Sequence, residues 1–239
     1  MRRIALVALT LCLTAPAALA QSQSVDFGND GSLATRSVEI LALVTLLSIV
    51  PGLAVMVTCF PFIVTVLSIL RQALGLQQSP PNMVIVSLAL FLTWFVMDPV
   101  FTQVWLQGVQ PLTDGKIDVQ QAIPLILSPF RGFMVARTSP ETFAHLQALR
   151  PGSAGAAMNA PLSLLVPSFM LSEISRAFEI GFLIYLPFLI IDLVTAAILM
   201  SMGMMMVPPA VVSLPFKLAF FVVADGWTLI SGALVRSYS

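Results

Sequence analysis

Apolar residues dominate four long stretches of the chain, and short polar segments separate them. The first stretch runs without a charged residue from Ile40 to Leu70. As one helix it would be roughly 46 Å long at 1.5 Å per residue, whereas the hydrocarbon core of a bilayer is about 30 Å thick. It also contains Pro51, Gly52 and Pro61. We therefore expect either one kinked helix or two shorter pieces.

The other stretches have the same character, with prolines and isolated charges inside apolar runs. This pattern predicts an all-α membrane protein with about four long, proline-broken hydrophobic helical segments that form hairpins. Broken helices are tolerated at membrane depth where protein covers them. We therefore expect these helices to pack mainly against other subunits and less against lipid.

The first twenty residues have the features of a cleavable signal peptide. Arg2 and Arg3 precede an apolar run of about ten residues, and Ala18-Leu19-Ala20 provides an A-x-A cleavage site. The alternative is an uncleaved anchor. Cleavage would leave the mature N-terminus outside the cytoplasmic membrane and remove Cys12, so that Cys59 could form no intramolecular disulfide.

Charge and apolar content divide the chain further, because charged residues, prolines and glycines return between the second and third apolar stretches. The predicted organisation is a signal peptide at 1–20, a flexible external segment at 21–36, a first hydrophobic helical pair at 37–106, a polar external segment at 107–160, and a second hydrophobic helical pair at 161–239.

A methionine-rich stretch interrupts the second pair at 200–206, where five of seven residues are methionine, and Pro208 and Pro209 follow it. Methionine is unbranched and deformable, which suits a surface that must close on variable partners. Gly203 loosens the backbone and the prolines stop a helix. The stretch therefore predicts an adaptable apolar loop at a helix end; the alternative is a methionine-rich patch of membrane helix.

Composition excludes several functions. The chain is 58% hydrophobic and 9% charged, and its 11 basic and 11 acidic residues balance, so no basic field is present to attract nucleic acid. Its single histidine, His145, and the lack of cysteine–histidine clusters argue against a metal site. Nucleotide-binding and nucleophile-elbow motifs are also missing from the sequence. We therefore expect no enzyme activity, no metal and no cofactor.

Ionisable residues inside the apolar stretches are the remaining candidates for functional residues, because burying a charge is costly and usually has a purpose. They are Asp98, Asp192, Lys217 and Asp225. One hypothesis is an ion-carrying path through Asp192; the other is a structural ion pair of Asp192 or Asp225 with Lys217. A polar stripe also places Arg176 and Glu179 three residues apart on one helix face, where they could pair.

Several blocks of sequence together resemble one family. The most specific are RQALG at 71–75, LPFLIIDLV at 186–194 and MSMGMMM at 200–206. The further blocks that carry the resemblance lie at 77–82, 88–93, 97–100, 130–134, 165–169, 172–174, 178–182, 213–218 and 223–227. In this order they are similar to the FliP family, the flagellar biosynthetic proteins of the type III secretion export gate, from about Ile40 to the end.

The resemblance implies a subunit of a protein-conducting pore in the cytoplasmic (inner) membrane, at the flagellar basal body. Members of the family assemble as a pentamer with FliQ and FliR, work with the export apparatus proteins FlhA and FlhB, and pass unfolded flagellar proteins. Their methionine loop forms a gasket that seals the idle pore. Carried over, the gasket residues would be Met204, Met205 and Met206, with Met200 and Met202 beside them.

Two alternatives remain for the function. A subunit of a virulence injectisome would share the same core, although the signal peptide and the block at 71–82 favour the flagellar branch. A proton-coupled transporter would need a chain of carboxylates near the midplane, and Asp192 has no evident carboxylate partner on its own helix face. Asp98 is not assigned a function.

Overall fold

The computed structural model describes residues 33–76, 80–150, 155–204 and 206–238, which divide into two compact units after Ser48. The predicted signal peptide at 1–20 lies outside the described residues, as does most of the predicted flexible segment at 21–36. Helix α2 (Leu33–Met56) begins in the first unit and continues into the second. In the first unit its apolar side chains, such as Leu41 and Leu47, are exposed.

The first apolar stretch consists of two helices, which is one of the two arrangements expected. Helix α2 runs through positions 51 and 52, and the break follows Met56. Helix α3 (Phe60–Ala73) then starts with Pro61 in its first turn. A proline fits there because the first N–H groups of a helix have no partner within it.

The remaining described elements are also helical, which confirms the predicted all-α class. They are α4 (Asn82–Val104), a π-helical turn (Trp105–Val109), α5 (Gln110–Thr113), α6 (Val119–Arg137), α7 (Pro140–Ala148), a 3₁₀ turn (Ala157–Asn159), α8 (Leu162–Ser201), α9 (Pro209–Val223) and α10 (Gly226–Arg236). Several prolines, including Pro99, Pro167 and Pro187, lie within helices without ending them.

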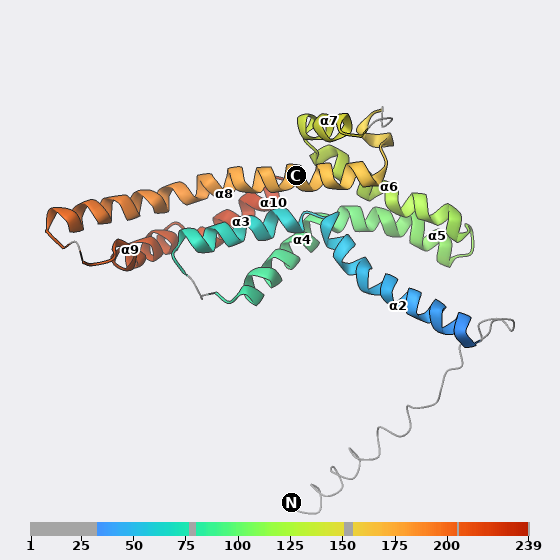
Figure 1. Cartoon of the computed structure of the whole chain (residues 1–239), viewed down its shortest axis with the longest axis horizontal. Helices are drawn as coiled ribbons and strands as arrows, with labels where there is room; N and C mark the ends of the chain where they lie inside the picture. The colour runs from blue at the N-terminus through green and yellow to red at the C-terminus, as the bar shows by residue number, and fades with distance from the viewer. Residues whose placement is uncertain (1–32, 77–79, 151–154, 205, 239) are drawn as a thin grey trace, which may run out of the picture. The chain divides into compact units, whose positions relative to one another are not determined.

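Helix α3 is the centre of the second unit. Its buried face, which includes Phe62, Leu67 and Leu70, packs along α8 and against α4 (Figure 1). Gly181 allows the close approach of α8, because a Cβ atom there would lie 2.4 Å from the Ile69 side chain. Helix α9, which follows the methionine loop in the chain, lies beside α8. The packing of α3 therefore holds α8, one of the two helices that carry the loop.

Within the described ranges, three helical stretches are long and apolar enough to cross a membrane: residues 36–56, 82–113 and 162–201. Helices α9 and α10 would add a fourth if they count as one span, although they bend by 62° where they meet. The structure therefore supports three or four spans where hydropathy predicts four. At 40 residues, α8 is about 60 Å long at 1.5 Å per residue, roughly twice the hydrocarbon thickness.

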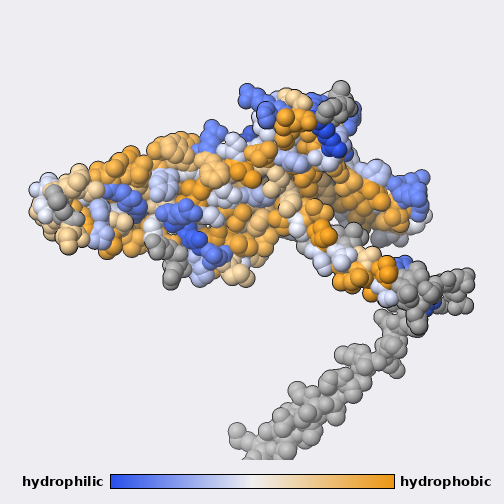
Figure 2. All heavy atoms as spheres, in the orientation of Figure 1, coloured by the Kyte–Doolittle hydropathy of each residue, from blue (hydrophilic) through white to orange (hydrophobic). Residues whose placement is uncertain are grey.

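Part of the stretch between 107 and 160 belongs to the core of the second unit. The helical run that starts at Asn82 continues past residue 106 to Thr113. Met134 of α6 is buried against Leu165 and Phe169 of α8. Many other apolar side chains remain uncovered, and Figure 2 shows hydrophobic residues spread widely over the visible face of the molecule.

Candidate functional site

The methionine stretch forms the connection between α8 and α9. Met200 lies in the last turn of α8, and Met202, Met204 and Met206 follow its end. All four side chains are exposed, and Met206 is the most exposed at 97%. Met205 lies outside the described residues. Four of the five predicted gasket residues therefore direct apolar, flexible side chains away from the chain's own core.

Backbone hydrogen bonds set the tight turn at this helix end. The Gly203 N–H donates to the Met200 carbonyl at 3.0 Å, and the Met204 N–H donates to the Leu199 carbonyl at 3.0 Å. Gly203 has φ +74°, a left-handed conformation that glycine adopts without the steric cost of a Cβ atom. Pro208 then caps the start of α9, whose first residue is Pro209. The exposed methionines are thus placed on a short turn between two fixed helices.

A polar cluster joins the two helices that carry the loop. Lys217 Nζ of α9 lies 2.6 Å from Asp192 Oδ2 of α8, and it also donates to the Ala73 carbonyl of α3 at 3.0 Å. The Ser213 hydroxyl donates to Asp192 Oδ1 at 2.5 Å. The Ala73 carbonyl lies at the C-terminal end of α3, where a cation is favourable. We name Asp192, Ser213, Lys217 and the Ala73 carbonyl the loop tie.

The ion pair therefore joins Lys217 to Asp192 and not to Asp225. Asp225 is exposed between α9 and α10, with φ +47°, and forms no ion pair in the part of the chain that the structure describes. It lies beyond the end of α9, whereas Lys217 is buried on the face that contacts α8.

The possible pair of Arg176 and Glu179 does not form within the described residues. Glu179 is exposed and Arg176 is half-buried. Both side chains can remain solvated, and an exposed ion pair gains little free energy over solvation, typically about 0–1 kcal/mol. Asp98 is likewise exposed on α4, and His145 is exposed on α7.

Sequence reasoning missed a second polar cluster, which contains the most deeply buried charge among the described residues. The side chain of Glu173 is fully buried and accepts a hydrogen bond from Arg137 Nε at 3.2 Å. The Tyr238 hydroxyl also donates to Glu173, and Arg137 Nη1 donates to the Ser237 carbonyl at 2.8 Å. We name Arg137, Glu173, Tyr238 and the Ser237 carbonyl the tyrosine tie. The available signal was an acidic residue, Glu173, within a mostly apolar helix.

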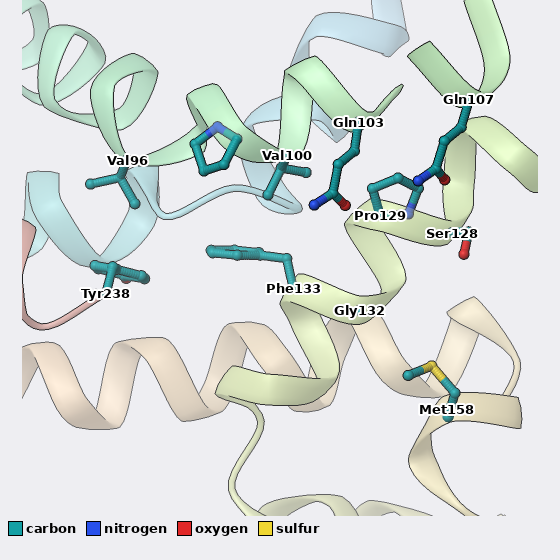
Figure 3. Close-up of a pocket in the computed structure, with 11 residues that line it drawn as sticks. Val96, Val100, Gln103, Gln107, Ser128, Pro129, Gly132, Phe133, Met158 and Tyr238 are labelled. Carbon is teal, nitrogen blue, oxygen red and sulfur yellow. The ribbon is translucent and has the colours of Figure 1, made fainter. Parts of the chain in front are cut away.

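A cavity of about 500 Å³ lies between α4 and α6, beside this cluster. Gln103, Gln107 and Ser128 line it at one end, and the rings of Phe133 and Tyr238 line it at the other (Figure 3). The polar lining carries no charged side chain. No group of three histidine, cysteine or acidic residues within the described ranges could hold a metal ion.

Cys59 lies at the start of α3, in the same buried core. Burial raises the pKa of its thiol to about 12 from the ordinary 9.0, and the nearby Glu173 carboxylate acts in the same direction. The thiol is therefore neutral at physiological pH and poorly reactive while the core is closed.

Comparison with known proteins identifies the family. The family model for FliP matches residues 43–234, which is most of the chain. The chain belongs to the FliP family. It is 46% identical over 238 residues to the flagellar biosynthetic protein FliP of Caulobacter vibrioides, covering 98% of this chain and 90% of the relative.

Other FliP proteins are similar to the same extent. The flagellar biosynthetic protein FliP of Agrobacterium fabrum is 46% identical, with 98% of each chain covered. That of Rhizobium meliloti is 45% identical, with 100% of each chain covered. The resemblance drawn from the sequence blocks is thus confirmed at the level of the family.

Proposed function

We propose that this chain is a core pore-forming subunit of the flagellar type III protein export gate. It works in flagellum biogenesis and conducts unfolded flagellar proteins across the cytoplasmic membrane. The observation that carries the proposal is the short turn of exposed methionines between two fixed helices. Membership of the FliP family supports the flagellar assignment.

The chemistry of methionine explains how such a turn could seal a pore. Rings of apolar side chains can close a narrow opening to ions by dewetting it. Each methionine has three rotatable bonds and little shape preference, so a passing polypeptide could push it aside. Leucine or phenylalanine would close more rigidly, and polar side chains would admit water. One copy of the turn cannot surround an opening, so the seal requires several copies.

The exposed apolar surface supports assembly with further subunits. Helix α8 leaves Phe182, Leu193 and Ile198 exposed, and α9 leaves Phe216 and Val222 exposed. Soluble monomers rarely leave large contiguous apolar patches uncovered, so lipid or protein must cover this surface. We propose a homo-oligomer, a pentamer by resemblance to the family, together with FliQ, FliR and the export apparatus proteins FlhA and FlhB.

We propose that the loop tie is structural and does not conduct protons. Both carboxylate oxygens of Asp192 already accept hydrogen bonds, from Ser213 and Lys217. A proton path would need a chain of carboxylates, and the side-chain contacts of Asp192 within the described residues are with the Ser213 hydroxyl and the Lys217 ammonium. The tie instead fixes α9 against α8 close to the methionine turn.

The test replaces Met204, Met205 and Met206 together with alanine in flagellated cells. We expect assembled complexes to remain and the cytoplasmic membrane to become leaky to small ions, because the alanine side chain is too short to close the opening. The matched control replaces Met83 and Met158, which are also exposed but lie on other elements. A triple variant that assembles and stays ion-tight would contradict the gasket.

A further inference from the structure

Two polar clusters hold the α9–α10 arm in addition to its apolar contacts with the core. The loop tie holds α9 near the methionine turn, and the tyrosine tie holds the turn that follows α10. We propose that Tyr238 is a positioning residue: its hydroxyl bond to Glu173 fixes α10 against α6 and α8, and thereby fixes the direction in which α9 presents the methionine turn. The inference rests on the proposed function of that turn.

The contacts around Glu173 are complete only when this turn is in place. Glu173 Oε1 accepts from Arg137 Nε at 3.2 Å, and Oε2 accepts from the Tyr238 hydroxyl. Arg137 Nη1 donates to the Ser237 carbonyl at 2.8 Å. Two consecutive residues therefore supply hydrogen bonds to both buried charges, and of the guanidinium nitrogens only Arg137 Nη2 has no hydrogen-bond partner within the described residues. Release of the turn would leave a buried carboxylate oxygen and a guanidinium N–H unpaired, which is strongly unfavourable.

The ring of Tyr238 adds apolar contacts that fix its position. The Arg137 guanidinium carbon lies 4.1 Å from the ring centroid, a favourable cation–π geometry. Phe133 of α6 stacks on the ring at 6.0 Å between centroids, and Phe62 of α3 meets it edge to face at 5.4 Å. Figure 3 shows the Phe133 and Tyr238 rings near each other above α8. Burial raises the pKa of the Tyr238 phenol, so its hydroxyl stays protonated and can donate.

The arm needs this second attachment because it is bent. Helices α9 and α10 meet at 62°, and Asp225 at the bend has φ +47°. Helix α10 buries only Gly226, Ile230 and Leu234 along its described length. Without the tyrosine tie, these few apolar contacts and the contacts of α9 with α8 would hold the bent pair, and α10 could pivot about the bend. The tyrosine tie removes this freedom and makes the position of α9 depend on a contact far from the methionine turn in sequence.

The test uses the native thiol of Cys59 as a reporter. Cys59 is fully buried in the core cluster against which Tyr238 packs. The assembled complex would be labelled with N-ethylmaleimide near neutral pH, and peptide mass mapping would separate Cys59 from Cys12. The variants are Tyr238→Phe, which removes only the hydroxyl, and Tyr238→Leu, which also removes the ring. Tyr185→Phe is the matched control, because Tyr185 is the other tyrosine and its hydroxyl bonds to none of the described residues.

We expect Cys59 to be labelled about tenfold faster in Tyr238→Phe, the factor that corresponds to losing a hydrogen bond to a charged group, and faster still in Tyr238→Leu. Tyr185→Phe should label at the wild-type rate. Ion leak per assembled complex should rise in Tyr238→Phe and more in Tyr238→Leu, so that phenylalanine partly rescues it. The proposal would be overturned if Cys59 in Tyr238→Phe were labelled at the wild-type rate. It would also be overturned if Tyr185→Phe accelerated the labelling of Cys59 as much as Tyr238→Phe does.

Labelling and leak separate this inference from the proposed function. Faster labelling of Tyr238→Phe without any rise in leak would overturn the positioning of the methionine turn, provided that the triple methionine variant does leak. A triple methionine variant that stays ion-tight would overturn the gasket itself, whatever the labelling rates show. Native mass of each variant complex establishes that assembly is intact.

Discussion

The first half of α8 carries more polar residues than the second half, yet the chain's own helices bury more of it. In the first half, Leu165, Phe169 and Ala177 are completely buried against the chain's own helices. In the second half, Phe182, Leu193 and Ile198 are each more than half exposed. The Glu173 side chain in the first half is fully buried and that of Asp192 in the second half is 30% exposed, although Glu179 in the first half is exposed as well. Hydropathy alone therefore does not indicate which half of an apolar helix is buried by other helices of the same chain.

The largest effect is expected at Glu173. Glu173→Ala would leave the Arg137 guanidinium buried without its carboxylate, which typically costs about 3–5 kcal/mol. Thermal unfolding of the purified protein would show a much lower midpoint. The double variant Arg137→Met, Glu173→Leu should recover part of the loss because it removes both charges together. If Glu173→Ala were as stable as the wild type, loss of the buried charge in the first half of α8 would be tolerated as well as loss of a charge in the second half.

A pair of leucine substitutions tests the two halves directly. Leu165→Ala should lower the free energy of unfolding of the isolated chain by about 2–5 kcal/mol, because it opens a cavity in the core. Leu193→Ala should change it by less than about 0.5 kcal/mol, and its effect should instead be seen in the yield of assembled complex. Equal effects of both substitutions on the unfolding of the isolated chain would contradict the difference between the halves.

Asp192→Asn should have an intermediate effect. The asparagine can still bond to Ser213, but it loses the ion pair with the buried Lys217, at a cost of roughly 1–3 kcal/mol. We expect less assembled complex, with nearly normal secretion per complex that does assemble. Asp98→Asn is the matched control, because Asp98 is exposed and forms no ion pair within the described chain. Fully assembled complexes that do not secrete would instead favour a transport role for Asp192.

The smallest effect near neutral pH is expected at Cys59. Its folded pKa is raised to about 12 from 9.0, so above pH 9 the unfolded chain loses the proton while the folded chain keeps it. Stability is then unaffected below about pH 8 and falls as pH rises from 9 towards 12, by at most about 1.4 kcal/mol per pH unit. The melting temperature of Cys59→Ala should therefore decline less than that of the wild type between pH 8 and pH 10.

Much of the fold could be predicted because it depends on local signals. Apolar runs and prolines indicate helices and connections, and the family blocks indicate the order of the elements. Pro61, however, marks the start of α3, while Pro51 leaves α2 continuous. A proline in a helix interior and one in a first turn look alike in sequence, and only the neighbouring packing distinguishes them.

The candidate site was predictable only in part, because ion pairs depend on tertiary contact. From the sequence, Lys217 could pair with either Asp192 or Asp225. In the structure it pairs with Asp192, 25 residues away. The bond between Glu173 and Tyr238 joins residues 65 positions apart, and no periodicity indicates such a contact. The exposure of the methionine turn agrees with its composition, but composition alone does not exclude a patch of membrane helix.

The central claim is that the methionine turn works only as one of several copies around an opening. Native mass spectrometry of the complex purified from membranes tests this most directly. The account predicts a closed oligomer containing several copies of this chain, five by resemblance to the family, with further subunits attached. A stable, functional monomer would contradict it, because a single turn cannot seal a pore.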